Sequence, residues 1–64
     1  MESYQQRVED EKKELDERIG KLKAFFPTAA FGQLDGEEQE RMFTQADLMQ
    51  RYSNILGKRI DNFK

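Results

Sequence analysis

The sequence predicts an all-α fold, in which two long antiparallel helices form a hairpin through a short turn-helix connection and assemble into a homo-oligomeric helical bundle. Three observations support this. Apolar residues recur with helical spacing in both halves, a single proline separates the halves, and 64 residues leave room for only one core. We therefore expect one domain over 1–64, with a helix over about 3–26, a connection over 27–35 and a helix over about 36–63.

The first helix is predicted from one apolar stripe. Successive members of the stripe are 4, 7, 4, 3, 3 and 1 residues apart, which fits a helical face and not a strand. Ser3 is a plausible N-cap, and Pro27 ends the helix because proline disfavours helical geometry in the residue before it. The members of the stripe are Tyr4, Val8, Leu15, Ile19, Leu22, Phe25 and Phe26.

The connection contains its own capping signals. Thr28 can cap a single helical turn, after which Phe31 and Leu34 would fold back over the end of the hairpin. Asp35, followed three residues later by Glu38, resembles a capping box and predicts the start of the second helix. A connection this short makes the two long helices antiparallel neighbours.

The second helix has a wider apolar surface than one partner can cover. Its main stripe has steps of 4, 3, 3, 4, 4 and 3 residues, and Leu48 and Ile55 widen it on one flank. A helix with this much apolar width is typical of one that contacts two neighbours, so we expect the chain to pair with copies of itself. The members of the main stripe are Met42, Ala46, Met49, Tyr52, Leu56, Ile60 and Phe63.

Composition argues against several classes of function. The chain has no Cys and no His, which removes the thiolate and imidazole groups of many enzymes and metal sites. A balance of 11 basic and 13 acidic residues argues against nucleic-acid binding, and no apolar run is long enough to span a membrane. The run over 9–14 holds four carboxylates and two adjacent lysines, which indicates a solvated face. We predict no enzymatic activity, no metal and no cofactor.

A polar gap interrupts the first apolar stripe at Glu11 and Lys12. Counting back from the turn places about 50–54 opposite this gap, including Arg51, Tyr52, Ser53 and Asn54. The gap would be either a polar ligand pocket, lined by Glu11, Lys12, Arg51, Tyr52 and Asn54 with Arg51 facing it, or an ion pair that sets the register of the helices. Both alternatives remain open from the sequence.

A second cluster is expected at the open end of the hairpin, where Tyr4, Arg7, Lys58, Arg59 and Phe63 approach one another. Cations beside aromatic rings can receive an anion or a nucleotide through charge and stacking. The alternative is that the rings plug the end while the cations cap helix carbonyls. The candidate ligand-binding residues from both clusters are Tyr4, Arg7, Arg51, Tyr52 and Arg59.

Gly57 is unusual because glycine inside a helix costs about 1 kcal/mol relative to alanine. Close approach of the other helix or of a partner would account for it, as would fraying near the end of the helix.

One set of positions, spread over almost the whole chain, carries a resemblance to known proteins. These positions are Tyr4, Gln5, Arg7, Val8, Glu11, Lys12, Leu15, Asp16, Ile19, Leu22, Phe25, Met49, Tyr52, Ser53, Ile55, Leu56, Arg59, Ile60 and Phe63. Through them the chain resembles a family of short helical-hairpin proteins from tailed phages and prophages, related to crAss-like phage proteins. The resemblance implies a protein that works in the cytoplasm of the infected bacterial host and neutralises a defence factor. Its architecture also resembles phage hairpin oligomers that sequester cyclic nucleotide signals.

The resulting hypothesis is a phage-encoded, non-enzymatic binding protein that counteracts host defence. Its expected partners are other copies of itself and either a host defence protein or a cyclic nucleotide signal, with no membrane. The alternatives are a small nucleic-acid-associated regulator built as a hairpin dimer, which the net charge of −2 disfavours, and a structural adaptor.

Overall fold

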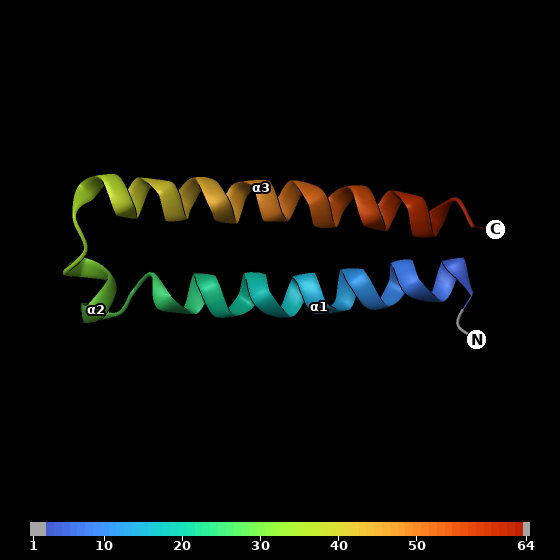
Figure 1. The fold of residues 1–64 in the computed structure, drawn as a ribbon, viewed down its shortest axis with the longest axis horizontal. Helices are drawn as coiled ribbons and strands as arrows, with labels where there is room; N and C mark the ends of the chain where they lie inside the picture. Colours follow the sequence, from blue (N-terminus) through green and yellow to red (C-terminus); the bar gives the residue numbers. More distant parts are fainter. Residues whose placement is uncertain (1–2, 64) are drawn as a thin grey trace.

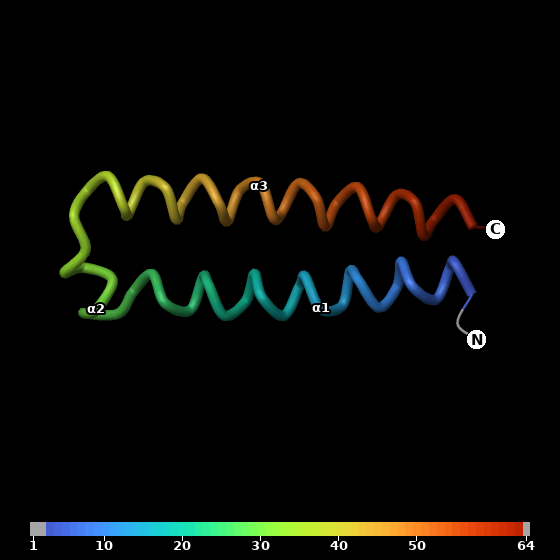
Figure 2. Tube along the Cα trace, viewed as in Figure 1, coloured from blue at the N-terminus to red at the C-terminus, as the bar shows by residue number. Residues whose placement is uncertain are grey.

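A computed structural model describes residues 3–63. The chain forms helix α1 (Tyr4–Phe25), the short helix α2 (Ala29–Gly32) and helix α3 (Gly36–Asp61). α1 and α3 lie side by side and run in opposite directions, and α2 joins them at one end (Figure 1 and Figure 2). Residues 3–63 contain no strand, so the prediction of an all-α chain is confirmed.

Side-chain caps set the starts of all three helices. The hydroxyl of Ser3 accepts a hydrogen bond from the Gln6 amide at 3.1 Å, and the Asp35 carboxylate accepts one from the Glu38 amide at 2.7 Å. The hydroxyl of Thr28 accepts from the Phe31 amide at 3.2 Å and donates to the carbonyl of Phe25 at 2.6 Å. Thr28 therefore caps α2, as predicted, and also ties it to the end of α1.

The seam between α1 and α3 differs from prediction at one position. Tyr52 was expected in the apolar stripe, but 45% of its surface is exposed, whereas Ser53 is 1% exposed. Within 42–63, the apolar side chains that are buried or half-buried, together with Ser53, follow steps of 4, 3, 4, 3, 4 and 3 residues, the regular spacing of a helix-helix seam. A residue at 52 falls outside this spacing. These side chains are Met42, Ala46, Met49, Ser53, Leu56, Ile60 and Phe63.

Phenylalanine rings close the turn end of the molecule. The Phe31 ring is 6% exposed and lies 5.1 Å from that of Phe26 and 5.3 Å from that of Phe43, measured between centroids. The side-chain amide of Gln39 donates to the backbone carbonyls of Phe31 and Leu34 at 3.1 Å each. The connection is therefore held to α3 both by apolar packing and by hydrogen bonds from a side chain to backbone carbonyls.

The molecule is long and narrow, with extents of 45 × 18 × 15 Å. Its main core cluster consists of Val8, Leu15, Ile19 and Leu56 along the seam. Within residues 3–63, no helix is both long enough and apolar enough to cross a membrane.

Candidate binding site

The open end of the molecule brings Tyr4, Arg59 and Phe63 together. The guanidinium carbon of Arg59 lies 5.5 Å from the centroid of the Tyr4 ring, and Arg59 donates a hydrogen bond to the Tyr4 hydroxyl. The Tyr4 ring meets the Phe63 ring edge-on, with centroids 6.0 Å apart. The predicted approach of these three residues is confirmed. The arrangement holds a cation against an exposed aromatic ring.

The hydrogen bond to Tyr4 raises the pKa of Arg59 above its ordinary value, which favours the charged form. Arg59 forms no ion pair with a carboxylate in the part of the chain that the structure describes. The charge of Glu11 also contributes to the raised pKa of Arg59.

Tyr52 and Glu11 form a second contact near this end of the seam. The Tyr52 hydroxyl donates to the carboxylate of Glu11, at 2.6 Å to one oxygen and 2.8 Å to the other. This hydrogen bond to a carboxylate raises the pKa of Tyr52 and keeps its hydroxyl protonated. The pair joins α1 to α3 while leaving the Tyr52 ring exposed.

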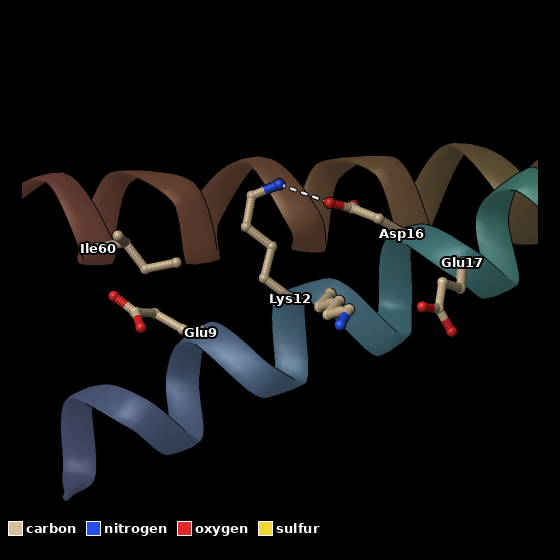
Figure 3. Close-up of a pocket in the computed structure, with 6 residues that line it drawn as sticks. Glu9, Lys12, Asp16, Glu17 and Ile60 are labelled. Atoms are coloured by element: carbon tan, nitrogen blue, oxygen red, sulfur yellow. Dashed lines mark hydrogen bonds and ion pairs between the residues drawn. The ribbon is translucent and has the colours of Figure 1, made fainter.

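The polar gap in α1 is filled by an interaction that the sequence did not predict in this form. The Lys12 ammonium nitrogen lies 2.8 Å from a carboxylate oxygen of Asp16 and donates to the Ser53 hydroxyl at 3.2 Å. Ser53 in turn donates to the other oxygen of Asp16. The hydrogen bonds from Lys12 and from Ser53 lower the pKa of Asp16. Figure 3 shows Lys12 extended along the seam to Asp16.

The expected composition of the gap is wrong for Arg51 and Asn54. Tyr52 does lie opposite Glu11, as predicted. Arg51 was expected to face the gap, but it lies on the exposed side of α3 and pairs with Asp47 at 3.1 Å, with 72% of its side chain exposed. Asn54 accepts a hydrogen bond from Gln50 within α3. The physical reason is the 100° rotation per helical residue, which places Arg51 about 200° around α3 from the buried Ser53.

Lys12 and Asp16 also border an open groove of about 480 Å³. Charges of both signs line it, and Ile60 is the residue that α3 contributes (Figure 3). The charged side chains come from successive turns of α1, so the groove presents a solvated helix face and not converging ligand groups.

Gly57 has a clear steric role in this region. A Cβ atom at residue 57 would lie 3.3 Å from the Cε atom of Lys12. Of the explanations considered from the sequence, close approach of the other helix is the one confirmed, since the stem of Lys12 passes over the glycine on its way to Asp16.

The structure thus gathers three of the five predicted ligand-binding residues, Tyr4, Tyr52 and Arg59, along one edge of the seam. Arg7 is exposed on α1 about one turn beyond Tyr4. Sequence reasoning missed Asp16, and it placed Ser53 opposite the gap without assigning it a contact. The four-residue spacing of Lys12 and Asp16 is a helical ion-pair signal, and Ser53 is the residue that restores the regular steps along α3.

The model of the Sequestin family matches residues 2–62. This chain belongs to the Sequestin family. It is also similar to an uncharacterized 7.5 kDa protein from the denB-rIIB intergenic region of Enterobacteria phage T4, at 38% identity over 62 residues, which cover 97% of each chain. No solved structure matches. The expectation of a family of small phage proteins is confirmed, and the family name indicates a binding function by sequestration. The link to crAss-like phage proteins stays a prediction.

Proposed function

We propose that this chain is a phage-encoded, non-enzymatic protein that counteracts a host defence by sequestering its nucleotide signal in the cytoplasm of the infected bacterium. The observation that carries the proposal is the exposed edge on which Arg59 lies over Tyr4 next to the Tyr52–Glu11 pair. The family name and the similarity to a phage protein support a sequestering role. Self-association through α3 is part of the proposal.

The chemistry of this edge suits a nucleotide better than a simple anion. Arg59 offers a planar set of N–H donors to a phosphate, and the exposed ring of Tyr4 offers a stacking surface to a base. The Glu11 carboxylate would repel a second phosphate but can accept hydrogen bonds from the N–H groups of a base. A ligand that carries both negative charge and base donors matches this combination.

The proposal is tested by equilibrium dialysis of the purified protein against cyclic mononucleotides, cyclic dinucleotides and a DNA duplex at two salt concentrations. We expect saturable retention of a cyclic nucleotide that is recovered chemically unchanged after the protein is denatured. A ligand recovered in cleaved form would contradict the non-enzymatic role.

The other outcomes identify the alternatives. Binding of the duplex with a steep loss at high salt would favour a nucleic-acid-associated regulator. Retention of none of these probes would overturn the nucleotide proposal and leave a host defence protein as the target or a structural adaptor as the function.

A further inference from the structure

α3 carries a second apolar stripe that α1 does not cover. Leu48, Tyr52 and Ile55 are 58%, 45% and 54% exposed, and their steps of 4 and 3 residues place them on one face. At 3.6 residues per turn, this face lies roughly 100° around α3 from the seam with α1. The expected widening at Leu48 and Ile55 is thus a separate exposed stripe.

The chain exposes more surface than a compact monomer of its mass does. Its accessible surface is 5056 Å², whereas a compact monomer of its mass of 7.6 kDa exposes about 4,300 Å². The excess of roughly 750 Å² is close to the area of about 800 Å² that each partner buries in a stable interface.

The shape leads to the same expectation. The radius of gyration is 14.8 Å, whereas a globular chain of 64 residues has about 11 Å and one of 128 residues about 14 Å. Two molecules that lie alongside each other along their 45 Å axis would roughly double the narrow cross-section without adding length. Pairing therefore brings the assembly close to ordinary globular proportions.

We infer that a second copy of this chain covers the stripe, with the two α3 helices antiparallel about a twofold axis next to Tyr52. This inference rests on the self-association included in the proposed function and specifies its surface and geometry. Leu48 lies four residues before Tyr52 and Ile55 three residues after it, about 6 Å and 4.5 Å along the helix. A twofold axis at Tyr52 therefore sets Leu48 against the partner's Ile55, which makes the stripe complementary to itself.

Charge distinguishes the antiparallel pair from a parallel one. Arg59 and Gln45 are each seven residues from Tyr52, so the antiparallel pair sets Arg59 beside the partner's Gln45. A parallel pair would set Arg59 beside the partner's Arg59 and would also align the two helix dipoles. The repulsion between the two arginines and the alignment of the helix dipoles both disfavour the parallel pair. In the antiparallel pair, the neutral side chain of the partner's Gln45 leaves Arg59 free to bind an anion.

The test uses single and double charge substitutions at exposed positions. Ile55→Glu or Leu48→Lys should weaken dimerisation by about 100-fold, because each change occurs twice per dimer and each site costs about tenfold. The double variant Leu48→Lys/Ile55→Glu should recover most of this loss, since lysine and glutamate then face each other across both contacts. Asn54→Glu is the matched control, because it adds one exposed charge on the other flank of α3 and should leave the dimer intact. Sedimentation measures mass, and circular dichroism measures helicity.

A cross-linking measurement covers variants that lose helicity as monomers. The chain has no natural cysteine, so Tyr52→Cys at the axis should be joined to its copy by a short bismaleimide, whereas Asn54→Cys should not. Failure of Tyr52→Cys to cross-link more efficiently than Asn54→Cys would overturn the inference.

A wild-type chain that is monomeric and helical at tens of micromolar would also overturn it, as would an Ile55→Glu variant that dimerises normally. Single variants that are monomeric, with a double variant that is no better, would refute the antiparallel register. A wild-type dimer that retains no nucleotide refutes the proposed ligand and leaves the pairing intact. A monomer that binds nucleotide would refute the pairing and leave the proposed ligand intact.

Discussion

The two ends of the molecule are both rich in aromatic residues, yet they have different physical character. At the turn end, Phe31 is nearly buried among the rings of Phe26 and Phe43, and the Gln39 side chain donates a hydrogen bond to the backbone of the connection. At the open end, Tyr4 is 61% exposed and its hydroxyl is bound to an arginine. The comparison suggests that the turn end supplies stability, while the open end presents polar groups at the surface.

The largest expected effect comes from truncating one aromatic ring at each end and comparing the losses of stability. Phe31→Ala should destabilise the protein by about 3 kcal/mol, because it leaves a cavity under the connection. Tyr4→Ala removes a mostly exposed ring and should cost about 1 kcal/mol or less. Urea denaturation followed by circular dichroism measures both. Equal losses would show that the ends contribute equally to stability.

The second prediction isolates the chemistry of the open end. Arg59→Ala should weaken retention of a cyclic nucleotide about 10- to 100-fold, the typical loss when a charge-assisted hydrogen bond is removed. Arg51→Ala is the matched control, because Arg51 is on the exposed side of α3 and pairs with Asp47. Equilibrium dialysis compares the two at unchanged helicity. If both variants bind as the wild type does, the predicted site is wrong.

The third prediction concerns the close approach of Lys12 to Gly57. Gly57→Ala alone should give little stabilisation, because the new methyl group crowds the stem of Lys12. In a Lys12→Ala background the same change should add about 0.5–1 kcal/mol, the helix-propensity gain of alanine over glycine. Denaturation of the four proteins in the double-mutant cycle gives the difference. An identical gain in both backgrounds would argue against the close approach.

The smallest expected effect is the dependence of stability on acid. The pKa of Asp16 is lowered in the folded protein by Lys12 and Ser53, so the contribution of this group to stability is present above its ordinary pKa of 3.8. The contribution is lost as the pH falls through the lowered folded value. The loss should be modest, because 45% of the Asp16 side chain is exposed. Asp16→Asn should flatten the acid limb of the stability curve, measured by thermal denaturation between neutral pH and pH 2.

Sequence reasoning predicted the secondary structure well because its determinants are local. Ser3, Thr28 and Asp35 each bond to an amide three residues ahead, and Pro27 restricts its immediate neighbour. The apolar spacing also identified most of the seam. The caps and the proline break depend on residues within one helical turn, and the apolar spacing repeats along the chain. The sequence alone therefore contains the information needed.

The contacts within the candidate site depend on the angular position of each side chain around its helix, which the spacing of residues in the sequence gives only approximately. An error of one residue around a helix rotates a side chain by 100°, enough to put Tyr52 in the seam in place of Ser53 and Arg51 at a gap from which it is turned away. The open-end cluster was easier to predict, because its approach depends on the antiparallel arrangement and tolerates such an error.

By itself, the sequence determined the all-α class, the capped helix starts, the break at Pro27 and the excess apolar width of α3, since local propensity and periodicity encode all of these. The tertiary structure alone decided the partners that are far apart in the chain. It brought Lys12 to Ser53, Tyr52 to Glu11 and Arg59 to Tyr4. Which polar groups meet is set by the register of one helix against the other, and that register follows from packing of the whole seam.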